Sequence, residues 1–232
     1  MLIRSILFYV CLTMWTILMG ITCVPYLFAP NVHMQKPVKL WIFGIFLLLK
    51  QLCKITYEIK GRENIPDYPL IIASKHQSAF ETFVLFYTIK NAVFIHKKQL
   101  FYIPIFGQYL KKLNMISIDR TGKAITMRRM IADTKTKISN GSSIIIFPEG
   151  TRKRPGEIPD YKTGFIGIYK ATNSKILPVA LNSGNFWPKH SFIKKKGHII
   201  IQFLEVIPNN LDRSKVFNEV KNKIEIATNL II

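Results

Sequence analysis

A histidine and a carboxylate lie close together in an otherwise apolar part of the sequence. His76 stands five residues before Glu81, within Ser-Lys-His-Gln-Ser-Ala-Phe-Glu at positions 74–81. Histidine can remove a proton near neutral pH because its ordinary pKa is about 6.5. A neighbouring carboxylate fixes the imidazole tautomer and stabilises the imidazolium that forms. Such a pair can activate an alcohol that is itself the nucleophile, so the protein needs no nucleophile of its own.

The spacing of the pair decides whether the two side chains can meet. On one continuous helix, five residues would place them about 140° apart. The sequence from Ser78 to Glu81 has the pattern of a capping box, which predicts a helix start with Glu81 in its first turn. His76 then lies in the preceding loop, and Glu81 reaches back toward it. Taken alone, these residues also fit a capping glutamate and an ordinary loop histidine.

A second polar motif, Phe-Pro-Glu-Gly-Thr-Arg at 147–152, follows an apolar run at 143–146 that predicts a buried strand. Polar groups at the carboxyl end of such a strand lie where α/β folds bind ligands. The planar guanidinium of Arg152 can make two charge-assisted bonds to a phosphate. An ordinary turn with a solvated arginine is the alternative interpretation.

Together the two motifs resemble the glycerophospholipid acyltransferase family, and specifically its bacterial 1-acylglycerol-3-phosphate acyltransferases. Segments 115–120 and 176–180 are similar to two further family blocks, and all four blocks occur in family order over about residues 70–182. The resemblance implies a catalytic dyad of His76 and Glu81, with glutamate where the family more often has aspartate. It implies acceptor-binding roles for six residues: Lys97, Arg120, Glu149, Gly150, Thr151 and Arg152. For Lys97 and Arg120, a solvated surface charge is the alternative.

The resemblance implies a membrane enzyme of phospholipid biosynthesis. It would move a fatty acyl group from acyl carrier protein or coenzyme A to the sn-2 hydroxyl of 1-acyl-glycerol-3-phosphate, giving phosphatidic acid. The thioester is then a co-substrate, and no cofactor or metal is expected. Glycerol-3-phosphate or another lysolipid as acceptor, and a non-catalytic lipid-binding membrane protein, are the alternatives.

The remaining histidines and the cysteines do not suggest a metal site. His96 adjoins Lys97 but has no nearby carboxylate in the sequence, which indicates a strand-end residue. The three cysteines are isolated and form no Cys-x-x-Cys pair. Their number also argues against a disulfide framework and favours a reducing compartment.

The amino-terminal residues predict an attachment to the membrane. Residues 5–35 contain no charged side chain, and residues 5–24 as a helix would be about 30 Å long, the thickness of a bilayer's apolar core. A cleaved signal peptide is the alternative for this first run. The second apolar run, 40–49, has ten residues, too few to span, and is predicted to lie in the membrane interface or to return as a half-buried helix. Residues 1–50 are therefore predicted to be membrane-anchoring helices.

The chain is strongly basic, with 33 Lys and Arg against 13 Asp and Glu and a net charge of +20. This charge favours anionic bilayer surfaces, an anionic lysophosphatidate acceptor and an acidic acyl carrier protein. The lysine-rich loop 189–196 is a candidate contact with lipid headgroups. Nucleic acid is the rival partner, disfavoured by the uncharged amino-terminal run and the lack of nucleic-acid-binding motifs. We expect a bacterial inner membrane location with the catalytic domain on the cytoplasmic side.

Residues 51–232 are predicted to form one catalytic domain. Strands are expected near 55–59, 69–74, 92–96, 115–119, 143–147, 176–181 and 198–206. Helices are expected near 79–90, 105–113, 123–139, 163–172 and 212–228. This alternation predicts the α/β class, with a mixed, largely parallel sheet covered by helices.

Overall fold

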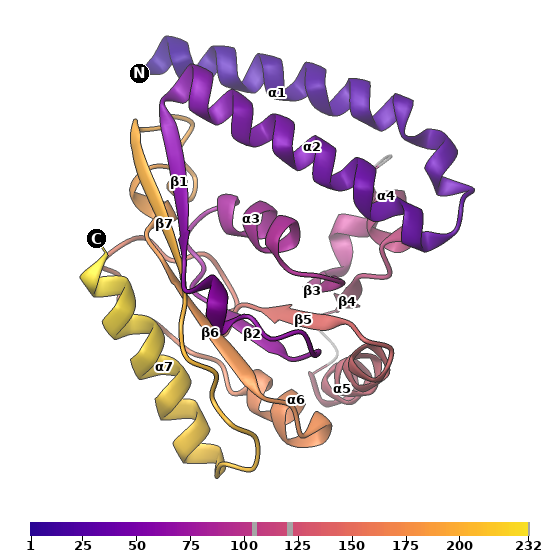
Figure 1. Ribbon diagram of the computed structural model, residues 1–232, viewed down its shortest axis with the longest axis vertical. Helices are drawn as coiled ribbons and strands as arrows, with labels where there is room; N and C mark the ends of the chain where they lie inside the picture. The colour runs from indigo at the N-terminus through magenta and orange to yellow at the C-terminus, as the bar shows by residue number, and fades with distance from the viewer. Residues whose placement is uncertain (104–105, 120–122, 232) are drawn as a thin grey trace.

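A computed structural model describes residues 1–103, 106–119 and 123–231 (Figure 1). The strands are β1 Ile55–Lys60, β2 Ile71–Ser74, β3 Ala92–Lys97, β4 Ile116–Ile118, β5 Ser143–Ile146, β6 Ile176–Leu181 and β7 Gly197–Phe203. The helices are α1 Leu2–Thr22, α2 Gln35–Leu48, α3 Phe80–Thr88, α4 Phe106–Lys112, α5 Lys123–Ser139, α6 Gly164–Thr172 and α7 Arg213–Leu230.

The seven strands form one sheet in the order β1-β7-β6-β2-β5-β3-β4. Every neighbouring pair is parallel except β6 and β7. The predicted mixed, largely parallel sheet is therefore confirmed. Because β7 runs against β6, the starts of β7 and β1 lie at the same edge of the sheet as the carboxyl ends of β2, β5 and β6.

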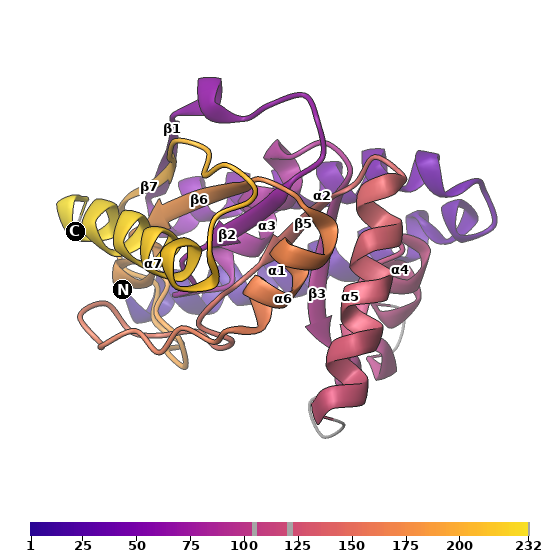
Figure 2. The same ribbon diagram turned by 90° about the horizontal axis from the view of Figure 1, so that it is seen from below.

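Helices cover both faces of the sheet. Figure 1 shows α1, α2 and α3 on one side and α5, α6 and α7 on the other, and Figure 2 shows the second group from below. Every residue of β2, β5 and β6 is buried. Strands that are covered on both faces need apolar residues at successive positions, which explains the continuous Ile-rich runs in the sequence.

The second amino-terminal helix extends beyond its apolar run at both ends. A 3₁₀ turn at Asn31–Met34, α2 and a π turn at Leu49–Cys53 follow one another without a break. The result is a 23-residue helical segment, and α1 has 21 residues. Both are long and apolar enough to cross a bilayer by length and composition. Lys39 and Lys50 do not end the helix, because a long lysine stem can carry its charge away from an apolar surface.

The two amino-terminal helices pack against each other and leave an apolar face outside. The Trp15 indole donates to the Trp41 carbonyl at 2.9 Å, and the Trp41 indole donates to Thr16 at 3.1 Å. Gly44 permits this approach, since a Cβ there would lie 2.3 Å from Trp15 Nε1. On α1, nine large apolar side chains are exposed: Leu2, Ile3, Ile6, Leu7, Val10, Met14, Ile17, Leu18 and Ile21. Apolar surface of this extent marks a membrane or partner contact.

Candidate active site

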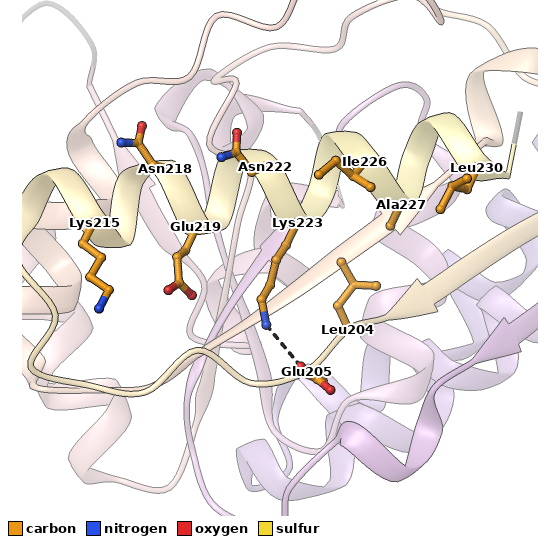
Figure 3. A pocket seen from close by; sticks show the side chains of 10 residues that line it. All are labelled: Leu204, Glu205, Lys215, Asn218, Glu219, Asn222, Lys223, Ile226, Ala227 and Leu230. Carbon is orange, nitrogen blue, oxygen red and sulfur yellow. Dashed lines mark hydrogen bonds and ion pairs between the residues drawn. The ribbon is translucent and has the colours of Figure 1, made fainter.

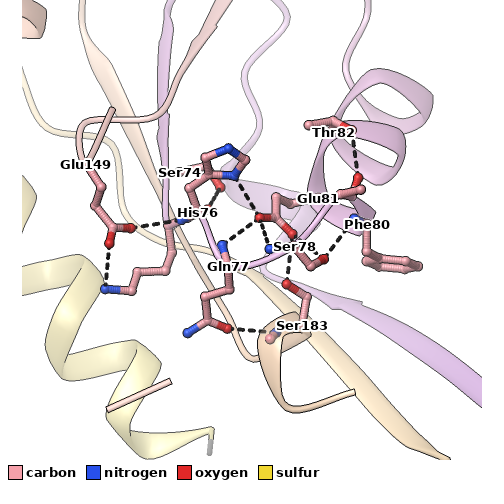
Figure 4. Close-up of polar contacts among 12 residues, drawn as sticks. Ser74, His76, Gln77, Ser78, Phe80, Glu81, Thr82, Glu149 and Ser183 are labelled. Carbon is pink, nitrogen blue, oxygen red and sulfur yellow. Dashed lines mark hydrogen bonds and ion pairs between the residues drawn. The ribbon is translucent and has the colours of Figure 1, made fainter. Parts of the chain in front are cut away.

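The structure brings His76 and Glu81 together at the carboxyl edge of the sheet. His76 lies in the loop between β2 and α3, and Glu81 lies in the first turn of α3. The two atoms His76 Nδ1 and Glu81 Oε1 are 2.9 Å apart (Figure 4). Glu81 is fully buried, and the His76 side chain is 16% exposed. The spacing argument thus led to the observed geometry, while the catalytic roles stay predictions.

The Glu81 carboxylate accepts five hydrogen bonds. Oε1 accepts from His76 Nδ1 and from the backbone nitrogens of Gln77 and Ser78, both at 2.7 Å. Oε2 accepts from the hydroxyls of Ser78 at 2.9 Å and Ser183 at 2.8 Å. A buried carboxylate needs such donors to replace the water it has lost. Together they fix the carboxylate in one orientation toward the imidazole.

These contacts keep Glu81 ionised although it is buried. Burial alone acts to raise its pKa. The hydrogen bond and charge of His76, with the bonds from Ser78 and Ser183, outweigh burial and hold the pKa below its ordinary value of 4.5. An ionised Glu81 can only accept a hydrogen bond, so Nδ1 of His76 must carry the proton that it donates. In a neutral imidazole the free lone pair is then on Nε2.

The predicted capping box is present with a shift of one residue. The Ser78 hydroxyl accepts from the Phe80 backbone nitrogen at 2.8 Å, and the Ser78 backbone donates back to Glu81. The helix begins at Phe80 with Ala79 as its N-cap, one residue after the predicted start. Glu81 therefore both caps α3 and partners His76, so the two interpretations of this carboxylate hold together.

A stacked aromatic ring fixes the plane of the imidazole. The rings of His76 and Phe147 lie 3.9 Å apart between centroids with an interplanar angle of 15°. Nδ1 is bonded to Glu81, and Nε2 has no hydrogen-bond partner within residues 1–103, 106–119 and 123–231. The arrangement leaves Nε2 as the atom that can take a proton from a bound alcohol.

The motif at 147–152 and the residue after it also bond to the backbone of His76. Glu149 Oε1 accepts from the His76 backbone nitrogen at 2.9 Å, and the Lys153 backbone nitrogen donates to the His76 carbonyl at 2.8 Å. Glu149 is 1% exposed. Its carboxylate, predicted to bind the acceptor, is directed at the loop that carries His76. Its role in acceptor binding stays a prediction.

A cluster of charged side chains surrounds the Glu149 carboxylate that bonds to the His76 backbone. Lys75 Nζ lies 2.7 Å from Glu225 Oε1 and 3.4 Å from Glu149 Oε2. The Tyr161 hydroxyl donates to the same Glu225 oxygen at 2.8 Å. Burial raises the pKa of Glu149, and the Lys75 charge only partly offsets this effect. Glu225 belongs to α7, so the cluster joins the carboxyl-terminal helix to the loop that carries His76.

The other predicted acceptor-binding residues that the structure describes follow β5 or end β3. Gly150 adopts a positive φ of 66° in the turn after Phe147, a conformation that favours glycine, and Thr151 is exposed. Arg152 is half-buried, and its guanidinium forms no ion pair within the described ranges. Lys97 is exposed at the end of β3, with β5 between it and the strand of His76. Arg120 lies outside the described residues.

Other candidate sites are weaker. His96 Nδ1 donates to the Lys97 carbonyl, and its ring packs edge-on against Phe101, with no carboxylate partner in the described part of the chain. Within the same ranges, no cluster of three or more His, Cys, Asp or Glu side chains is arranged to hold a metal ion. A surface groove runs along α7 between Lys215 and Leu230 (Figure 3), and none of the predicted site residues lines it.

Comparison with known proteins places these residues in a family. Residues 56–182 match the family model described as Acyltransferase. A Pseudomonas aeruginosa 1-acyl-sn-glycerol-3-phosphate acyltransferase is 32% identical over 85% of this chain and 77% of that protein. A Cocos nucifera protein of the same name is 30% identical over 59% of this chain. This chain spans only 45% of the Cocos protein.

The fold is also that of a solved structure. The crystal structure of the 1-acyl-sn-glycerophosphate (LPA) acyltransferase PlsC from Thermotoga maritima superposes with a TM-score of 0.77 at 23% identity. The match covers 97% of this chain and 95% of that chain, so it includes the amino-terminal helices as well as the sheet.

Proposed function

This chain belongs to the acyltransferase family, and on that premise we propose that it transfers a fatty acyl group to the sn-2 hydroxyl of 1-acyl-glycerol-3-phosphate, giving phosphatidic acid. The observation that carries the proposal is the contact of His76 Nδ1 with the ionised, fully buried Glu81 at 2.9 Å. The names of the similar proteins from Pseudomonas and Cocos support this choice of acceptor.

The proposed reaction needs one base that later acts as an acid. Nε2 of His76 removes the proton of the acceptor hydroxyl as its oxygen attacks the thioester carbonyl. Glu81 stabilises the imidazolium that forms. When the tetrahedral intermediate collapses, the C–S bond breaks and the leaving sulfur takes the proton from the imidazolium. The products are the new ester and the free thiol of the carrier.

The acceptor is proposed to be held by its phosphate. Arg152 follows the turn at Gly150, so its guanidinium comes from the same segment that holds the His76 backbone. A guanidinium that forms no ion pair within the described ranges is available to a phosphate. Lys97, at the end of β3, and Arg120 complete the proposed set. Glu149, Gly150 and Thr151 are proposed to shape the turn that presents Arg152.

Membrane association fits the exposed apolar face of α1 and the two long amino-terminal helices. We propose that residues 1–50 anchor the enzyme in a bacterial inner membrane and that residues 51–232 act on its cytoplasmic side. The acyl donor is proposed to be acyl carrier protein or coenzyme A thioester, drawn by the basic surface. No metal, redox cofactor or nucleic acid has a part in this scheme.

The proposal is tested with purified full-length protein, labelled acyl-CoA and acyl-carrier thioesters, and a panel of acceptors. The panel contains 1-acyl-glycerol-3-phosphate, glycerol-3-phosphate and lysophospholipids with other headgroups. Labelled phosphatidic acid from the first acceptor, with markedly higher kcat/KM than from the others, is the expected result. If the acyl group goes chiefly to another acceptor, the protein is an acyltransferase with a different substrate from the one proposed. No transfer from either donor to any acceptor would reject the enzyme.

A further inference from the structure

A second cationic site lies at the carboxyl edge of the sheet, away from His76. A cavity there is lined by five residues: Met1, Arg4, Cys53, Lys194 and Lys196. Cys53 lies just before β1, with Lys54 between them, and Lys196 directly precedes β7; β6 separates β7 from β2. Three strand spacings separate β1 from β2, which is about 14 Å across the sheet. None of the residues assigned to the dyad or to acceptor binding lines this cavity.

One of the residues that line the cavity is a buried lysine, Lys194. Lys194 is 2% exposed, and its backbone nitrogen donates to the Ser5 hydroxyl of α1 at 2.9 Å. Its Nζ donates to the carbonyls of Ser191 at 3.0 Å and Phe192 at 3.1 Å. The same Nζ lies over the rings of Tyr9, at 4.8 Å, and Trp187, at 5.2 Å.

The Lys194 ammonium has no carboxylate partner within residues 1–103, 106–119 and 123–231. Carbonyl oxygens and ring faces attract a cation but leave its charge unbalanced, and burying an unbalanced charge is costly. Burial accordingly lowers the pKa of Lys194 to about 8. An anion in the cavity would balance this charge and favour the protonated lysine.

The mouth of the cavity adds two more cations and no acid. Arg4 and Lys196 are exposed, and no lining residue is an aspartate or a glutamate. A planar guanidinium beside two ammonium groups can bind the oxygens of a phosphate from several sides. The charge of the site therefore selects an anion, and its donors are of the kinds that bind phosphate.

Exposed apolar side chains occur close in sequence to the residues that line the cavity. Leu2, Ile3 and Ile6 of α1 are exposed close in sequence to Arg4, and Phe192 and Ile193 are exposed beside Lys194. The Phe192 ring stacks on Tyr9 of α1 with centroids 4.7 Å apart, so this loop and α1 form one surface. A cationic cavity accompanied by exposed apolar side chains fits an amphiphile that carries a phosphate better than a free ion.

We propose that this cavity binds the phosphate of an anionic membrane phospholipid, at a site separate from the acceptor site. The inference rests on the proposed membrane association. Its occupant would lie at the sheet edge that also carries the loop of His76, so one bound lipid would help hold that edge against the bilayer. The predicted headgroup contact of loop 189–196 then becomes specific, because Lys194 is the buried member of the loop and Lys196 an exposed one.

The test is calorimetric titration of the full chain in micelles of an uncharged detergent. Three probes are used: dihexanoyl-phosphatidylglycerol, dihexanoyl-phosphatidylcholine and inorganic phosphate. Arg4→Gln with Lys196→Gln removes two charges from the cavity. Lys50→Gln with Lys195→Gln is the matched control, because both lysines are exposed and neither lines the cavity. Circular dichroism and the Tm confirm that each variant is folded.

Saturable binding of the phosphatidylglycerol probe is expected to weaken at least about tenfold in the cavity variant, and far less in the control. Equal losses in the two variants would mean diffuse surface attraction and overturn the site. Equally tight binding of phosphatidylcholine would overturn its selectivity for net negative charge, and equally tight binding of inorganic phosphate would overturn the lipid assignment. The titration requires no acyl transfer, so its failure is distinguishable from failure of the proposed enzymatic function.

Discussion

The backbone nitrogen of His76 donates to the Glu149 carboxylate at 2.9 Å, so a side chain 73 residues downstream fixes the loop of the proposed base. The Lys153 backbone holds the His76 carbonyl from the same segment. The two motifs found in the sequence are thus one physical unit. The segment that carries Arg152, the proposed phosphate ligand, thus also sets the position of His76, the proposed base.

Replacing His76 by alanine tests the base directly. The His76→Ala variant is expected to lower kcat roughly 10²- to 10⁴-fold, the usual contribution of a general base. Acyl transfer to 1-acyl-glycerol-3-phosphate is measured at saturating donor. His33→Ala is the control, since His33 is exposed and far from the site in sequence. Activity within a few fold of wild type in His76→Ala would remove the dyad from the mechanism.

Glu81→Gln separates the charge of Glu81 from its structural role. The glutamine amide oxygen can still accept the hydrogen bonds that Glu81 Oε1 accepts. The amide nitrogen would replace Oε2, and the hydroxyls of Ser78 and Ser183 can rotate to accept hydrogen bonds from it. We therefore expect a folded protein whose kcat falls roughly 10²-fold or more, because the imidazolium loses its counter-charge. Thermal unfolding and steady-state kinetics are measured together. If Glu81→Gln keeps the wild-type kcat and only its Tm changes, Glu81 serves only to cap α3.

Local chemistry could be predicted from the sequence because it depends on short spacings. The separation of His76 from Glu81, with a helix start between them, dictated that the two side chains meet. The sequence predicted a strand at each of the seven positions where the described residues form one. Continuous apolar runs mark β2, β5 and β6, which are buried on both faces, whereas β1 and β7 alternate between buried and less buried residues. The start of α3 was off by one residue because the Ser78 hydroxyl accepts from the Phe80 backbone nitrogen, two residues on, so the helix begins one residue later than a cap at Ser78 predicts.

Contacts between distant segments could not be predicted in the same way. Ser183 donates to Glu81 from 102 residues away, and Lys75 meets Glu225 across 150 residues. No local pattern marks either contact, because each depends on how the loop after β6 and helix α7 close over the sheet. The second amino-terminal helix extends beyond its apolar run for a related reason: Lys39 and Lys50 bound that run but do not interrupt the helix backbone.

The lowered pKa of Glu81 predicts a specific acid dependence of stability. Because the pKa in the folded state lies below the ordinary 4.5, its contribution to the free energy of unfolding is complete above about pH 4.5. This contribution is lost as pH falls through the folded-state pKa. Urea unfolding midpoints of wild type and Glu81→Gln are compared from pH 6 to pH 3 in the same detergent. The difference between them should shrink toward acid pH.

An exposed carboxylate supplies the control for this comparison. Glu63→Gln changes an exposed side chain, so its difference from wild type should stay small and nearly constant over the same range. A Glu81→Gln difference that does not change down to pH 3 would mean that Glu81 is not the ionised partner that the hydrogen bonds indicate.

Removing Glu225 tests the link between α7 and the loop that carries His76. The Glu225→Ala variant takes the nearer partner from Lys75, which is 3% exposed, and leaves only Glu149 at 3.4 Å. We expect the free energy of unfolding to fall by about 2 kcal/mol, less than for a fully enclosed pair because the Glu225 side chain is 21% exposed. Glu219→Ala, in the same helix, is the control. If both variants lose the same free energy of unfolding, the loss comes from a general weakening of α7 and not from the ion pair with Lys75.

Arg152 is predicted to act on acceptor binding more than on chemistry. Arg152→Ala should raise the KM for 1-acyl-glycerol-3-phosphate roughly tenfold to a hundredfold, the worth of a charge-assisted bond to phosphate, with little change in the KM of the thioester. Arg154→Ala removes an exposed arginine two residues away and should change neither constant. Arg152→Lys should recover only part of the loss, because an ammonium cannot make the paired bonds of a guanidinium. A large fall in kcat with an unchanged acceptor KM would instead place Arg152 at the reacting centre, where it would stabilise charge that develops in the transition state.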